Sequence, residues 1–208
     1  MIDAALDRIR RTRQALGIVA QVVEQPADQA KTPTDVFRSI IQANRQLNIL
    51  LTQNFSSSDV YQQVSRAIGY AFRLRAHVAP ARMPEPPAFE AGKRPADVYR
   101  KLFECFQHLR DIAAFSHIEM LDLKVREADV ESAEPGDVYD MASLIVSELA
   151  YLHAQLKDAR PPYKIYPPGL KFPAHVYQRA GLLETQLIEL QAMVQRNPTW
   201  LQSETTKR

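Results

Sequence analysis

The sequence predicts an all-α protein, a bundle of about six helices joined by long proline-rich connections. Three observations carry this prediction: a short helix-start signature recurs five times, an apolar stripe follows each copy, and prolines gather between the stripes. With 208 residues and a hydrophobic content of 46%, the chain is long enough to bury one core of ordinary size. We expect residues 1–194 to form a single helical bundle. Residues 195–208 form a C-terminal tail, in which the lone Trp200 is either a docked anchor or part of a frayed end.

The signature consists of aspartate or histidine, then valine, then an aromatic residue, and four of its five copies place a proline two residues before the aspartate or histidine. Proline fits the first position of a helix because its missing N–H would have no partner there. A carboxylate two residues later faces the positive end of the helix. Thr32 and Ser56 also stand where a capping hydroxyl is expected, three residues before Asp35 and Asp59. The signature therefore predicts where helices begin.

An apolar stripe follows the valine of each copy. Counted from that valine, positions 0, 4, 7, 11, 14 and 18 are apolar in 28 of 30 cases, with Asn54 and Ser116 as the exceptions. The mean spacing of about 3.5 residues favours long helices that pack side by side along a shared edge. Residues 1–24 carry a similar stripe, which Arg13 interrupts, so we count six helices.

The connections are long and rich in proline. Residues 78–94 and 160–172 each contain four prolines and cannot continue a helix. We expect these connections to lie across the ends or sides of the bundle. The short connection 54–56 predicts an antiparallel pair of helices. The spacing of 38 to 40 residues between the later copies also fits an α-solenoid of helix pairs, which we keep as the alternative architecture.

Composition excludes several classes of function. The net charge of +2 gives no strong attraction to nucleic acid, and no apolar run reaches the roughly 18 residues that a membrane span needs. The single Cys105 excludes an intramolecular disulfide and a cysteine-based zinc site. The six glycines do not cluster into a phosphate-binding loop, and no catalytic signature is present. We therefore expect neither an enzyme nor a resident cofactor.

One helical face carries residues of metal-ligand type. Glu104, His108 and Asp111 stand at i, i+4 and i+7, so their side chains line the same face and are placed to hold a metal ion or a proton. A solvated polar face has the same pattern. We favour the solvated face and expect no metal.

The leading functional hypothesis is a non-catalytic protein-interaction or scaffold module that uses the connections and exposed helix faces as contact surface. The alternative is a sensory or carrier bundle that holds a small organic ligand near the aromatic residues of the signature. A simpler interpretation is that each ring packs on the connection before it, with alternating helix directions dividing the rings between opposite ends. The candidate ligand-binding residues are Phe37, Tyr61, Tyr99, Tyr139 and Tyr177.

Overall fold

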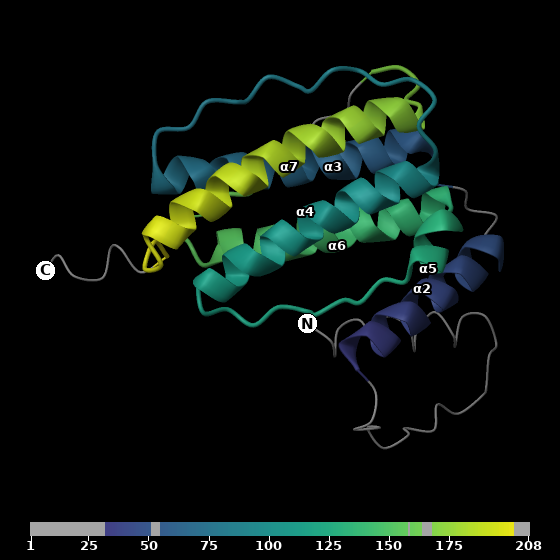
Figure 1. The fold of residues 1–208 in the computed structure, drawn as a ribbon, viewed down its shortest axis with the longest axis horizontal. Coiled ribbons are helices and arrows are strands. Elements are labelled where there is room, and N and C mark those ends of the chain that lie inside the picture. Colours follow the sequence, from purple (N-terminus) through teal and green to yellow (C-terminus); the bar gives the residue numbers. More distant parts are fainter. Residues whose placement is uncertain (1–31, 51–54, 158, 164–167, 202–208) are drawn as a thin grey trace, which may run out of the picture. The chain divides into compact units, whose positions relative to one another are not determined.

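The regular structure of the described residues is all helical, which confirms the all-α class. The computed structural model describes residues 32–50, 55–157, 159–163 and 168–201, which belong to one compact unit. Six helices and no strand occur within these ranges (Figure 1). Their bounds are α2 Pro33–Leu50, α3 Ser57–Val78, α4 Pro95–Phe115, α5 Glu127–Glu131, α6 Pro135–Ala154 and α7 Pro173–Arg196. The short α5 was not expected, and the predicted N-terminal helix within residues 1–24 lies outside the described residues.

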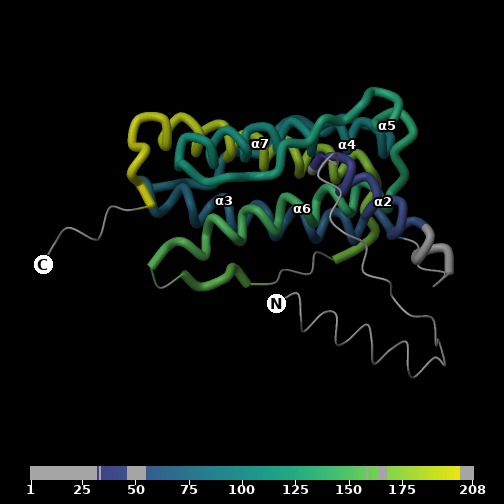
Figure 2. Tube along the Cα trace, turned by 90° about the horizontal axis from the view of Figure 1, so that it is seen from below, coloured from purple at the N-terminus to yellow at the C-terminus, as the bar shows by residue number. Residues whose placement is uncertain are grey.

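Four long helices, α3, α4, α6 and α7, form a bundle around one core (Figure 2). Each of α3 and α4 packs against both α6 and α7, whereas α3 makes no extensive contact with α4, nor α6 with α7. The four helices therefore stand at the corners of a square, with α3 diagonal to α4. This arrangement is a bundle and not a stack of helix pairs.

The apolar stripes of these four helices face the core, as the sequence predicts. Val64, Ala71, Ile145 and Leu187, all stripe positions, are completely buried. Burial of this kind supplies most of the favourable free energy of folding. The largest side chains with less than 2% exposure in the four bundle helices are Leu74, Leu102, Phe106, Leu109, Ile112, Met141, Ile145, Leu149, Leu152, Leu183 and Leu187.

All four bundle helices begin at the same end of the bundle (Figure 1). Their first turns surround a single small hollow of about 20 Å³. Each helix contributes its first residue and the valine of the signature to this hollow, and the lining residues are Ser57, Val60, Pro95, Val98, Pro135, Val138, Pro173 and Val176. The helices therefore run parallel, and the expectation that their directions alternate is wrong.

Connection length explains how a parallel bundle is possible. Residues 79–94, between α3 and α4, reach about 50 Å when extended, whereas a 22-residue helix is about 33 Å long. The connection can therefore return the chain along the whole bundle. It runs along α7, where the Gln178 side chain donates a hydrogen bond of 2.8 Å to the Pro87 carbonyl. In the connection between α6 and α7, residues 160–162 similarly lie against α3, where Arg73 donates to the Arg160 carbonyl.

Gly181 allows the first connection to approach α7 closely. A Cβ atom at this position would lie 2.9 Å from Cγ of Pro87. Alanine in an open helical position stabilises a helix by about 1 kcal/mol relative to glycine. We expect Gly181→Ala to lower the free energy of unfolding instead, because the proline ring must move.

Urea unfolding of a double-mutant cycle measures this effect. In a Pro87→Ala background the ring is absent, so Gly181→Ala should there be neutral or stabilising. A stabilisation of about 1 kcal/mol by Gly181→Ala in the presence of Pro87 would show that the contact imposes no constraint.

In each of the four bundle helices, a side chain at the start accepts a backbone N–H. The reciprocal bonds expected at Ser56 and Asp59 are present, with the Ser56 N–H donating to the Asp59 carboxylate at 2.8 Å. In α4 and α6 the carboxylates of Asp97 and Asp137 accept the preceding capping N–H, each at 2.8 Å. In α7 the acceptor is Nδ1 of His175, at 3.1 Å. Because parallel packing brings four positive helix ends together, the three carboxylates stabilise this end of the bundle.

α2 lies outside the square of bundle helices. Val36 and Ile40, the first two stripe positions of the first copy, are 53% and 52% exposed, so the expectation that they join the shared core is wrong. The four other stripes already close the core, and α2 instead turns Phe37 and Ile41 inward, one position along the helix. Residues 51–54, which include Asn54 of the predicted 54–56 connection, lie outside the described residues.

Trp200 docks on the bundle. Trp200 is 1% exposed, and its indole N–H donates a hydrogen bond of 2.9 Å to the Ser116 hydroxyl at the end of α4. Its carbonyl lies 3.3 Å from Nε2 of His77, at the end of α3. Trp200 is therefore an anchor, not part of a frayed end.

Candidate functional site

Parallel packing brings the four signature tyrosines to one end of the bundle, but not into one pocket. Tyr139 stacks on Phe55 with ring centroids 4.0 Å apart, and its hydroxyl accepts a hydrogen bond from Gln63. The Tyr61 ring lies beneath Lys171 and Arg179. Each ring contacts a segment that precedes another helix, because Phe55 precedes α3 and Lys171 precedes α7. The simpler interpretation placed each ring on the connection before its own helix.

Tyr177 likewise faces outward, with the Lys93 ammonium 4.1 Å from its ring centroid. Phe37 and Tyr99 are the two signature aromatics that share a pocket. The five candidate residues thus do not form one site. Three of them, Tyr61, Tyr139 and Tyr177, make separate contacts, and Phe37 and Tyr99 share one pocket.

The pocket that holds Phe37 and Tyr99 lies between α2, the 116–134 connection and the starts of α4 and α6. Its volume is about 120 Å³. Apolar side chains come from two elements, Phe37 and Ile41 from α2 and Leu123 and Val125 from the connection. The polar lining residues are Thr34, Arg38, Gln42, Arg45, Lys124, Arg126, Asp129, Ser132 and Asp137. We call this space the α2 pocket.

An ion pair beside Tyr99 joins α2 to the bundle. The Arg45 guanidinium binds both carboxylate oxygens of Asp137, with its Nε 2.7 Å from Oδ1. The Asp137 side chain is almost completely buried. It also accepts the capping N–H of α6, so one carboxylate both caps α6 and anchors α2.

The buried Tyr99 hydroxyl remains protonated. Burial of its ring raises the pKa of Tyr99 to about 12, and the negative charges of Asp137 and Asp129 act in the same direction, against the opposing effect of Arg45. The residue is 7% exposed, and its hydroxyl has no hydrogen-bond partner within the described part of the chain. Tyr99 thus presents an unused donor to the pocket.

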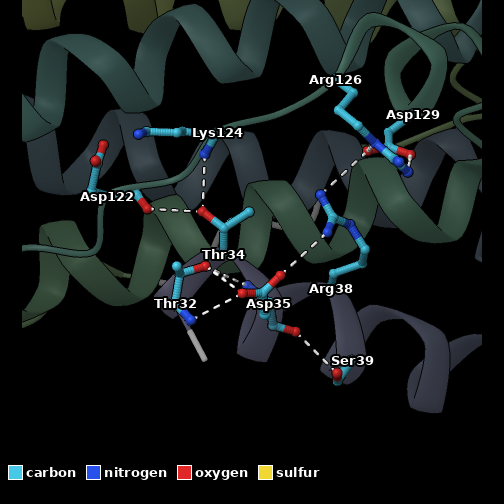
Figure 3. Close-up of polar contacts among 9 residues, drawn as sticks. All are labelled: Thr32, Thr34, Asp35, Arg38, Ser39, Asp122, Lys124, Arg126 and Asp129. Atoms are coloured by element: carbon cyan, nitrogen blue, oxygen red, sulfur yellow. Dashed lines mark hydrogen bonds and ion pairs between the residues drawn. The ribbon is translucent and has the colours of Figure 1, made fainter. Parts of the chain in front are cut away.

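The outer rim of the α2 pocket is charged (Figure 3). Arg38 lies 3.9 Å from Asp129, and Arg126 lies 2.7 Å from the same carboxylate. The Thr34 hydroxyl donates to the Asp122 carbonyl and accepts the Lys124 N–H, each at 3.1 Å, which fixes the connection against α2. The Lys124 ammonium itself has no partner among the residues that the structure describes.

Sequence reasoning found two lining residues of the pocket and missed the others. The pairing of Arg45 with Asp137 joins positions 92 residues apart, and no local pattern indicates it. Leu123 and Val125 stand two residues apart in a connection without helical periodicity. Apolar residues in an otherwise polar connection were the one available signal.

The predicted polar face of α4 bonds to α7 and within its own helix. Glu104 lies 2.5 Å from the Lys101 ammonium. His108 Nδ1 lies 2.8 Å from the Gln191 side-chain oxygen, whose amide nitrogen donates to Asp111 at 3.2 Å. Glu104 thus bonds to Lys101, whereas His108 and Asp111 share the side chain of Gln191. Across the described ranges, no group of three or more histidine, cysteine or acidic side chains is arranged to hold a metal ion.

His153 makes stability dependent on pH. It is 5% exposed and packs edge-on to the Tyr70 ring, 5.4 Å between centroids. Burial, assisted by the positive charge of Arg73, lowers the pKa of His153 below its ordinary value of 6.5. The unfolded chain therefore binds a proton more readily, and stability is lost as pH falls through 6.5.

We expect wild type to lose more stability than His153→Gln between pH 7 and pH 5, as measured by urea unfolding. The pKa values of Asp140 and Glu148 are raised by burial and act in the opposite direction, but both groups are present in both proteins. Equal pH dependence of the two proteins would contradict the assignment.

Comparison with known proteins does not assign the chain to a family. The chain matches no protein-family model, no curated protein and no solved structure with significance. Within the described residues, no helix combines the length and apolar character that a bilayer crossing requires. Function is therefore argued from the surface and the pocket.

Proposed function

We propose that the chain is a non-catalytic protein-interaction or scaffold module. The observation that carries the proposal is an apolar patch at the start of α7. Phe89, Leu170 and Phe172 are 51%, 83% and 61% exposed. Phe89 and Phe172 both contact the His175 ring, with centroids 5.1 and 5.8 Å apart, so residues of two different connections form one surface. Exposed apolar patches of this kind mark interaction sites in soluble domains.

The charge around this apolar patch defines the partner. Residues 168–183, which include Leu170 and Phe172 of the patch, contain the basic residues Lys171 and Arg179 and no acidic residue, whereas Glu90 follows Phe89. A segment of another protein that carries acidic residues together with apolar side chains is complementary to such a surface. The rigid bundle behind the patch holds it in place without ordering cost on binding.

The common start of the bundle helices supports a second part of the proposal. We propose that the chain arose by repetition of one unit, a helix-start signature followed by a long helix and a proline-rich connection. Repetition places equivalent connections on the outside of a parallel bundle, and there their sequences are free to differ. Such divergence suits a scaffold that contacts partners through its connections.

A photo-crosslinking residue introduced at position 172 tests the interaction, with the same residue at position 188 as control. Ile188 is 47% exposed on α7 and lies outside the apolar patch. In cells of its own host, we expect position 172 to capture a protein through a segment rich in aspartate or glutamate, and position 188 not to do so. Capture of the same protein at both positions, or of lipid alone at position 172, would contradict the proposal.

A second candidate function is a carrier or sensory bundle for a small organic ligand. The α2 pocket favours it, because two signature aromatics, a hydroxyl and an ammonium line one space, and neither polar group has a partner within the ranges that the structure describes. Sites for small molecules characteristically combine apolar walls with a few placed polar groups.

A further inference from the structure

The α2 pocket has the size of a single aromatic ring. Its volume of about 120 Å³ is close to that of an apolar cavity of about 150 Å³ that binds benzene. Phe37 and Ile41 on one element and Leu123 and Val125 on another provide apolar contacts for a flat ring.

The charges of the lining favour an anion. Four basic side chains line the pocket, Arg38, Arg45, Lys124 and Arg126, against two acidic side chains, Asp129 and Asp137. Arg45 is engaged by Asp137, and Arg38 and Arg126 share Asp129. The Lys124 ammonium has no partner in the described part of the chain, so it is available to a ligand carboxylate.

Tyr99 calls for a second feature of the ligand, a hydrogen-bond acceptor. Its hydroxyl is protonated, nearly buried and without a partner among the described residues. The hydroxyl oxygen is not among the fully buried polar atoms, so a ligand acceptor there replaces water and gains about 0.5 to 1.5 kcal/mol, the net value of a typical hydrogen bond. A polar substituent on the ring, such as a hydroxyl, meets this requirement.

We propose that the α2 pocket binds a monocyclic aromatic carboxylate, with its ring between α2 and the 116–134 connection and its carboxylate at Lys124. A hydroxyl on the ring accepts the hydrogen bond of Tyr99. This inference rests on the second proposed function and specifies its ligand class.

Titration of the full chain, followed by NMR and calorimetry, tests the inference with three probes. Benzoate and 4-hydroxybenzoate carry the proposed carboxylate, and benzamide is the neutral control. We expect 4-hydroxybenzoate to bind most tightly and benzamide at least about 10-fold more weakly than benzoate, as the loss of a charge-assisted hydrogen bond predicts.

Two variants locate the probes in the pocket. Lys124→Met should weaken both acids by about 10-fold, whereas Lys157→Met, at an exposed position outside the pocket lining, should leave both affinities unchanged. Tyr99→Phe should weaken 4-hydroxybenzoate by about 5-fold and leave benzoate unaffected, because only the hydroxylated ring uses the Tyr99 donor. A merely structural role of Tyr99 would reduce both affinities together.

Two outcomes overturn the inference, and only one of them also overturns the second proposed function. If benzamide binds as tightly as benzoate and Lys124→Met has no effect, the ligand class is wrong while a small-molecule site stands. If none of the three probes shifts the resonances of Phe37 and Tyr99, the inference and the second proposed function both fail.

Discussion

Replacing Leu149 by alanine is expected to lower the free energy of unfolding by about 2 to 5 kcal/mol, the cost of a core cavity. Leu149 lies in the stripe of α6 and is completely buried. Removal of its isopropyl group leaves space that the two neighbouring helices, α3 and α4, fill only in part. Urea unfolding measured by far-UV circular dichroism gives the difference.

The matched control is Leu170→Ala, which removes the same atoms from a side chain that is 83% exposed. We expect this change to stay within about 0.5 kcal/mol, as surface substitutions do. A loss below about 0.5 kcal/mol for Leu149→Ala would mean that the stripe of α6 does not face the core.

Replacing Asp137 by alanine is expected to cost about 2 to 3 kcal/mol and to release α2 from the bundle. The carboxylate caps α6 through the Glu134 N–H and binds Arg45 of α2. Because the Arg45 side chain is 45% exposed, water partly solvates the guanidinium that loses its partner. The expected loss is therefore smaller than for a fully buried ion pair.

Asp97→Ala separates the two roles of Asp137. Asp97 accepts the Arg94 N–H at 2.8 Å, the same length as the bond at Asp137, but makes no ion pair with α2 in the described residues. We expect Asp97→Ala to cost about 1 kcal/mol, so the difference between the variants reports the anchoring of α2. Equal losses would contradict the anchor, as would hydrogen exchange in α2 that stays unchanged in Asp137→Ala.

Local chemistry was enough to predict much of the bundle. Proline with an aspartate two residues later indicates the starts of α4 and α6 at Pro95 and Pro135, and Pro173 with His175 in place of aspartate begins α7. The spacing of apolar residues likewise indicates which face is buried, because a helix repeats its face regardless of its neighbours. These features depend on residues within a few turns of one another.

Helix direction and the position of α2 depend on the whole chain. A stripe has the same spacing in parallel and antiparallel bundles, so only the length of the connections carried information about direction. The Val36 stripe resembles the others, yet the core is complete without it, and its helix packs through Phe37 and Ile41 instead. The α2 pocket was unpredictable for the same reason, since it forms where α2 meets a connection without periodicity.

The parallel order of the four helices is the central claim, and the distance between two helix starts tests it most directly. Spin labels at positions 94 and 134 replace exposed capping residues of the neighbouring helices α4 and α6, whose own side chains make no capping bond. The native Cys105 is completely buried and burial raises its pKa, so it does not compete for the label. Neighbouring helix axes lie about 8 to 10 Å apart.

Pulsed electron paramagnetic resonance should therefore give a distance within about 20 Å between labels at positions 94 and 134, once the length of the label arms is included. In an antiparallel pair the same positions would be separated by the length of a 20-residue helix, about 30 Å, or more. A distance of about 20 Å or less is the result expected of parallel helices, and one above about 30 Å would contradict the fold.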